Sequence, residues 1–175
     1  EEKKLIEPGG TVVEGTFGNT GIALTMINNA RGYKTIIVMP DAASLEKRDI
    51  LRNLGAELRI VEVKPYKDPG NYQHISRRLA EELQAKGEGS VIWANQFDNT
   101  ANYQFHAKTT AREIYDQLDG KVDGFTCAIG TGGTLAGTSV GLKELNPDIK
   151  IACTDPQGAT MYRYFKDSVL EVTGD

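Results

Sequence analysis

The stretch TVVEGTFGNTGIALTMINNARGYKTIIVMP, residues 11–40, decides the fold, because two short β-rich runs flank one helical run. The runs 11–14 and 34–39 are nearly continuous in β-branched and apolar residues, which is typical of strands buried on both faces of a sheet. Residues 20–30 carry a helical pattern that Gly32 is placed to end. A strand, a helix and a strand in this order predict a right-handed crossover between parallel strands.

The same alternation of strands and helices continues along the rest of the chain. Strands are predicted at 57–63, 90–94, 123–129 and 149–155, and helices at 45–54, 71–86, 101–118 and 135–145. In the helix over 101–118, Ala111, Ile114 and Leu118 are predicted to face inward. The expected fold class is therefore α/β, with open parallel sheets flanked by helices.

Composition narrows the classes of function. The chain has 175 residues, 39% of them hydrophobic and 25% charged, a profile typical of a soluble globular protein. A net charge of −4 without a basic stripe argues against nucleic acid as a partner. No apolar run approaches the ~20 residues that span a membrane. Cys127 and Cys153 lie in apolar strand-like runs, which predicts buried free thiols and a reducing, cytoplasmic location.

Three unusual loops are expected beyond the carboxyl ends of the strands, where open α/β sheets bind ligands. They are GTFGNTG (15–21), ANQFDNTAN (94–102) and GTGGT (130–134). In GTGGT, glycines let backbone amides approach an anion, the following helix adds the positive end of its dipole, and the threonines add hydroxyl donors. A phosphate group is the expected ligand, although the same glycines could serve only to make a tight turn. Leu135 stands where a dinucleotide fingerprint needs glycine and a P-loop needs lysine, so a phosphomonoester fits better.

The loop GTFGNTG offers a second group of donors. Thr16, Asn19 and Thr20, together with the amides at the helix start, would suit a carboxylate or a phenolate oxygen. Gln96 in the second loop adds an amide donor. The alternative is that Asn19 or Thr20 simply caps the helix.

The side chains that usually perform acid–base or nucleophilic chemistry are scarce. Neither of the two histidines has a catalytic setting, and His106 is predicted to pack or cap. No His, Cys, Asp and Glu cluster has metal-ligand spacing, so a metal is not expected, and no nucleophile elbow is present. Anion-binding loops without acid–base groups indicate that a cofactor carries the chemistry.

Three motifs together identify a family. EGTFGNTGIAL (14–24), ANQFDNTAN (94–102) and GTGGTLAG (130–137), in this order and at these separations, resemble the cysteine synthase and cystathionine β-synthase family of fold-type II pyridoxal 5′-phosphate enzymes. The cysteine synthase (O-acetylserine sulfhydrylase) branch is the most similar, because no haem-binding or regulatory segment is visible. The resemblance implies a Rossmann-like fold of the tryptophan synthase β-subunit type. It also implies a small domain at 1–98 and the first part of a large domain at 99–175, whose remainder is absent.

The resemblance implies pyridoxal 5′-phosphate as cofactor and a β-replacement that forms L-cysteine from O-acetyl-L-serine, or a related activated serine, and sulfide. The residues implied to hold the cofactor phosphate are Gly130, Thr131, Gly132, Gly133 and Thr134. Asn19 is implied to bind the cofactor's ring oxygen. The residues implied to hold the substrate α-carboxylate are Thr16, Gly18, Thr20 and Gln96.

The chain also departs from the family pattern. Phe17 stands where the family normally has serine or alanine, and a ring pointing into the site would weaken substrate binding. The Schiff-base lysine is expected upstream of residue 1, so the parent protein is expected to be an enzyme, while this chain holds no catalytic residue. Two alternatives remain: condensation of serine with homocysteine, as in a cystathionine β-synthase, and a non-catalytic binding module. The family further implies a homodimer and serine acetyltransferase as a partner.

Overall fold

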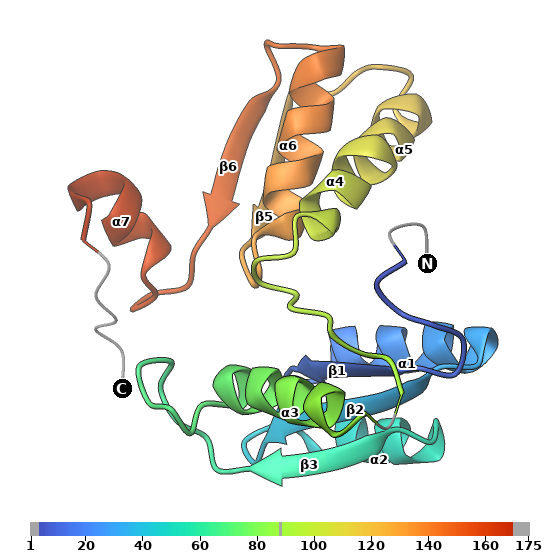
Figure 1. Cartoon of the computed structure of the whole chain (residues 1–175). Helices are drawn as coiled ribbons and strands as arrows, with labels where there is room; N and C mark the ends of the chain where they lie inside the picture. The colour runs from blue at the N-terminus through green and yellow to red at the C-terminus, as the bar shows by residue number, and fades with distance from the viewer. Residues whose placement is uncertain (1–3, 88, 170–175) are drawn as a thin grey trace. The chain divides into compact units, whose positions relative to one another are not determined.

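The structure, a computed structural model, describes residues 4–87 and 89–169. Contacts within the chain divide it into two compact units, Glu1–Gln96 and Phe97–Asp175. Each unit contains a parallel sheet with helices against it (Figure 1). The predicted fold class, open parallel sheets flanked by helices, is confirmed, whereas the assignment of a small and a large domain stays a prediction.

The first unit is built on a four-stranded parallel sheet with the order β3-β2-β1-β4. Its strands are β1 (Thr11–Gly15), β2 (Lys34–Pro40), β3 (Glu57–Val61) and β4 (Val91–Trp93). Its helices are α1 (Asn19–Arg31), α2 (Leu45–Asn53) and α3 (Tyr72–Lys86). The central place of β1 puts the loop that follows it in the middle of the sheet's carboxyl edge.

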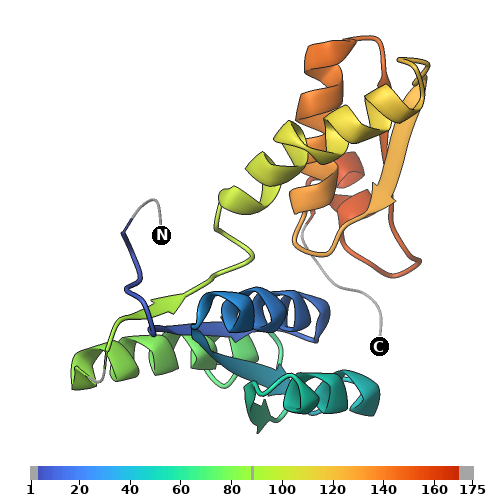
Figure 2. The same ribbon diagram turned by 90° about the vertical axis from the view of Figure 1, so that its right-hand side faces the viewer.

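Helices cover both faces of this sheet, with α3 on one side and α1 and α2 on the other (Figures 1 and 2). Alternate residues of β2 enter the two cores: Val38 packs with Tyr72 and Leu79 of α3, while Ile37 packs with Leu51 of α2. Because both faces are buried, the strand has to be apolar at successive positions.

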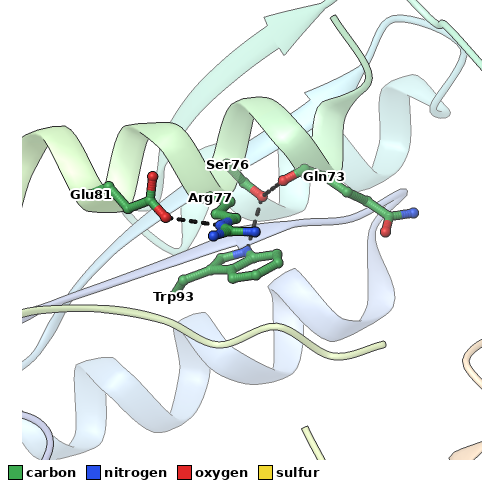
Figure 3. A network of polar contacts seen from close by, with 5 residues as sticks. All are labelled: Gln73, Ser76, Arg77, Glu81 and Trp93. Carbon is green, nitrogen blue, oxygen red and sulfur yellow. Dashed lines mark hydrogen bonds and ion pairs between the residues drawn. The ribbon is translucent and has the colours of Figure 1, made fainter. Parts of the chain in front are cut away.

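A network of hydrogen bonds fixes α3 on the sheet (Figure 3). The indole N–H of Trp93 donates to Ser76 Oγ over 3.1 Å, and that hydroxyl donates to the Gln73 carbonyl over 2.8 Å. Ser76 is fully buried. A Cβ on Gly15 would lie 2.8 Å from Ser76 Oγ and 2.9 Å from the Tyr72 carbonyl, so glycine is needed for α3 to approach the end of β1.

The second unit has a two-stranded parallel sheet, β5 (Gly124–Ala128) and β6 (Lys150–Thr154). Its helices are α4 (Ala101–Lys108), α5 (Thr110–Gln117), α6 (Gly133–Leu145) and α7 (Met161–Asp167). Its core gathers Ala111, Val122, Leu142 and Ile149. Ala111 and Ile114 face this core as predicted, but Leu118 is 50% exposed, so its predicted inward position is wrong.

Two elements of the second unit differ from the sequence prediction. The single helix expected over 101–118 is broken at Thr109, whose φ and ψ are −117° and −69°. The Thr109 hydroxyl donates to the Phe105 carbonyl over 2.9 Å, and such a bond to the preceding turn bends helices. The short helix α7 had no predicted counterpart.

The two cysteines are free, but they are half-buried, so their predicted full burial is wrong. Cys127 and Cys153 stand in register on the neighbouring strands β5 and β6. Burial, and to a smaller extent the neighbouring Cys153, raises the pKa of Cys127 above its usual value.

Among residues 4–87 and 89–169, no helix combines the length and apolar character that crossing a membrane requires. The same residues contain no cluster of three or more His, Cys, Asp or Glu side chains that could ligate a metal.

Candidate functional site

The loop between β1 and α1 is held in a tight, glycine-dependent conformation. Gly18 caps α1 with φ 150° and ψ −70°, a region that residues with a side chain rarely adopt. Its N–H donates to Thr16 Oγ1 over 3.1 Å, and the Thr16 N–H donates to the Val38 carbonyl over 3.0 Å. The loop is thereby fixed against the end of β2.

The interpretation of Asn19 or Thr20 as the helix cap is wrong, because both residues lie inside α1 and Gly18 is the cap. Their backbone N–H groups belong to the first turn, where amides have no intrahelical acceptor. The cap makes no side-chain hydrogen bond to them. The amino end of α1 can therefore offer several backbone donors to an anion.

The structure brings Thr20 and Gln96 together although 76 residues separate them. The Thr20 hydroxyl donates to Gln96 Oε1 over 2.6 Å, and Gln96 Nε2 donates to the Gly15 carbonyl over 2.9 Å. Because Gln96 follows β4 and Gly15 ends β1, the amide joins the carboxyl ends of two neighbouring strands. Three of the residues predicted to bind a carboxylate, Thr16, Thr20 and Gln96, thus gather around one loop.

Glu14 is a site residue that the sequence prediction missed. Its side chain is 1% exposed, and it accepts hydrogen bonds from the backbone of Gln96 and Asn95, while its Oε2 atom has no partner within the described chain. Burial, opposed in part by these hydrogen bonds, raises the pKa of Glu14 from 4.5 to about 7. A carboxylate in the apolar run TVVE, directly before a glycine loop, was the available signal.

Phe17 lies at the tip of the loop and is 43% exposed. Its ring contacts Tyr72 at the start of α3 edge-on, with the ring centroids 5.3 Å apart and the planes at 85°. The aromatic side chain is thus supported by α3.

The loop between β5 and α6 is the second candidate anion site. Gly132 caps α6 in the left-handed conformation, with φ 88°. No atom lies within 4 Å of where a Cβ would stand on Gly130 or Gly132, so the space beside these two glycines is open. Thr131 Oγ1 accepts a hydrogen bond from Asn102 Nδ2 over 2.9 Å, which leaves its own hydroxyl proton for another acceptor. Asn102 is the second residue that the sequence prediction missed.

The glycines that follow serve helix packing. Gly133, Gly137 and Gly141 are buried and spaced by four residues, so they lie on one face of α6. A Cβ at Gly137 would lie 2.0 Å from the Tyr103 carbonyl oxygen, and one at Gly141 would lie 2.4 Å from that of Ala107. The backbones of α4 and α6 therefore touch along this stripe.

Gly133 belongs to both features. A Cβ there would lie 2.0 Å from Asn102 Oδ1, so its lack of a side chain makes room for the residue that holds Thr131. His106 supports the same loop from α4: its Nδ1 is 2.9 Å from Thr110 Oγ1 and its Nε2 is 3.3 Å from Thr134 Oγ1. The packing of α4 against α6 thus orients both threonines of the loop.

Known proteins resemble this chain over nearly its whole length. The family described as "Pyridoxal-phosphate dependent enzyme" matches residues 1–173. The chain is 49% identical over 166 residues to "Cysteine synthase 1" of Neurospora crassa, covering 94% of this chain and 43% of that protein. It is 43% identical over 162 residues to "Cystathionine beta-synthase" of Apis mellifera, covering 92% of this chain and 31% of that protein.

Solved structures share the fold of this chain. The "Crystal structure of O-ureido-L-serine synthase" matches with a TM-score of 0.79 and 36% sequence identity, over 92% of this chain and 49% of that chain. The chain therefore spans less than half the length of each of these three proteins.

Proposed function

The chain belongs to the pyridoxal-phosphate dependent enzyme family, and from this membership we propose that the complete protein forms L-cysteine from O-acetyl-L-serine, or a related activated serine, and sulfide. The observation that carries the proposal is the 49% identity with Cysteine synthase 1, over a span that takes in both candidate loops. Serine acetyltransferase as a partner and a homodimer are implied by the family resemblance alone, and a cytoplasmic location is implied by the two free cysteines. All three remain predictions.

The loop Gly130–Thr134 fits the phosphate group of pyridoxal 5′-phosphate. The open space beside Gly130 and Gly132 admits an anion, and the amino end of α6 supplies backbone donors and a favourable dipole. Thr131 would donate its free hydroxyl proton to a phosphate oxygen. When bound, the cofactor supplies the electron sink for breaking and making bonds at the substrate β-carbon.

The loop of Thr16, Gly18 and Thr20, with Gln96, would hold the substrate α-carboxylate. The amides at the start of α1 would donate to its oxygens, while the bonds from Thr20 to Gln96 and from Gln96 to Gly15 keep the surrounding donors in place before the substrate arrives. Asn19 is exposed and forms no hydrogen bond with other side chains within the described residues, so its amide would be available to the cofactor's ring oxygen.

One experiment separates this proposal from its alternatives. The complete protein, loaded with pyridoxal 5′-phosphate, is supplied with O-acetyl-L-serine and sulfide, and in parallel with L-serine and homocysteine. We expect L-cysteine from the first pair only. Cystathionine from the second pair would favour the other branch, which the similarity to the Apis mellifera protein supports. Cofactor binding without either product would indicate a non-catalytic module.

The assignment of the catalytic lysine is tested on the 175-residue chain alone. It is mixed with pyridoxal 5′-phosphate and reduced with borohydride, and modified lysines are mapped by peptide mass. We expect no stoichiometric adduct at any single lysine. An adduct at one lysine would overturn the placement of the catalytic lysine outside this chain.

A further inference from the structure

Lys47 lies across the loop that precedes α1. It belongs to the first turn of α2, and a Cβ on Gly18 would lie 2.3 Å from its Cδ, 3.1 Å from its Cγ and 3.2 Å from its Cε. The aliphatic stem of Lys47 therefore rests on the backbone of Gly18. The φ of 150° favours glycine at position 18, and the stem of Lys47 occupies the space that a side chain there would fill.

Within the part of the chain that the structure describes, the charge at the end of this stem is unpaired. Lys47 is half-buried, yet its ammonium group forms no hydrogen bond or ion pair with any residue in 4–87 or 89–169. Its neighbours on α2 behave differently: Arg48 donates to the Asp41 carbonyl, and Arg52 pairs with Asp49 at 3.0 Å. Long cationic side chains usually place the stem on the protein and the charge in water or on a partner. The stem that carries this charge lies on the Gly18 backbone, next to the first-turn amides of α1 that can bind an anion.

We propose that Lys47 is a further substrate-binding residue, whose ammonium group pairs with the α-carboxylate of the amino-acid substrate held by the Gly18 loop. This inference rests on the proposed function, because it takes the carboxylate to lie at the amino end of α1. Backbone amides and a helix dipole stabilise an anion, and a cation within hydrogen-bond reach adds a charge-assisted bond. Lys47 would thereby select a free carboxylate over an uncharged amide.

The test compares two ligands on the cofactor-loaded complete protein. Equilibrium dissociation constants of L-serine and L-serinamide are measured by calorimetry, so that the readout does not depend on turnover. Lys47→Met removes the charge and keeps an unbranched stem over Gly18, while Lys47→Arg restores the charge. The matched control is Lys34→Met, because Lys34 is exposed at the start of β2, at the opposite end of the strand from the loop.

We expect Lys47→Met to weaken L-serine binding about tenfold, the size of one charge-assisted hydrogen bond, and to leave L-serinamide nearly unchanged. Lys47→Arg should recover most of the loss, and Lys34→Met should match the unmodified protein. In turnover, Lys47→Met should raise KM with little change in kcat. Equal weakening of both ligands would assign Lys47 to loop packing and overturn the proposal. Unchanged L-serine binding would overturn the role of Lys47 alone, whereas an unmodified protein that bound neither ligand would overturn the proposed function as well.

Discussion

The buried carboxyl of Glu14 makes the stability of the first unit depend on pH. Its pKa is about 7 in the folded protein against 4.5 as the ordinary value, so the folded state holds the proton more tightly than the unfolded state. The stabilisation of the folded state by the protonated Glu14 carboxyl is fully present below pH 4.5 and is lost as the pH rises through 7. At ~1.4 kcal/mol per pH unit, the difference of 7 minus 4.5 corresponds to roughly 3 kcal/mol of unfolding free energy.

The perturbation is Glu14→Gln, which keeps the size of the side chain and cannot ionise. Between pH 5 and pH 9, the free energy of unfolding of the unmodified chain should fall by roughly 3 kcal/mol relative to that of the variant. The reason is that Glu14 has to ionise in a buried place, whereas glutamine at this position cannot ionise. Trp93, the only tryptophan, lies in β4 of the same unit, so its fluorescence follows urea unfolding of this unit. The matched control is Glu57→Gln on β3, an exposed carboxylate paired with Arg59 at 2.8 Å.

The control should show the same pH dependence as the unmodified chain. A parallel ¹³C NMR titration of the side-chain carboxyl carbons should show one resonance, absent in Glu14→Gln, with its midpoint near pH 7. The reasoning would be refuted if the stability of the unmodified chain rose from pH 5 to pH 8 relative to that of Glu14→Gln. It would also be refuted if the stabilities of the two proteins changed equally with pH.

Three further substitutions test the two loops. Phe17→Ser removes the ring contact with α3, which should lower the free energy of unfolding by about 1 kcal/mol. It also adds a hydroxyl donor beside the substrate loop, which should lower KM for the activated serine. Unchanged kinetics would count against a role of Phe17 in substrate choice. Gly137→Ala places a methyl group against the Tyr103 carbonyl and should cost about 1–3 kcal/mol, seen as a lower midpoint in far-UV circular dichroism melting. Asn102→Ala removes the hydrogen bond to Thr131 and should weaken cofactor binding about fivefold in an absorbance titration, so an unaltered dissociation constant would contradict the supporting role.

The alternation of strands and helices was predictable from sequence because it depends on local pattern. Residues such as Ile36 and Ile37 must both be apolar when a strand is covered on two faces, and Gly32 ends α1 with φ 73°, as its position predicted. The break at Thr109 was not predictable, because it depends on a hydroxyl bond to the preceding turn.

In the candidate site, too, features set by local sequence were predictable and contacts between distant elements were not. Strand order alone brings Thr16 and Gln96 to one edge of the sheet, since β1 and β4 are neighbours. Lys47 and Asn102 could not be assigned from sequence, because each contacts a distant element that only packing brings near. The carboxylate of Glu14 in an apolar run was a signal that the sequence prediction overlooked. A motif shows which backbone approaches the ligand, but not which side chains surround that backbone.

The run of glycines from Gly130 to Gly141 has a consequence for how sequence variation in this protein should be interpreted. Gly130 and Gly132 border open space, whereas Gly133, Gly137 and Gly141 touch α4. All five could prove equally intolerant in a mutational scan or an alignment, for two unrelated reasons. A scan scored by abundance would detect the three packing glycines, and only a scan scored by catalysis would detect Gly130. An invariant glycine in this segment is therefore not by itself evidence that the residue contacts the ligand.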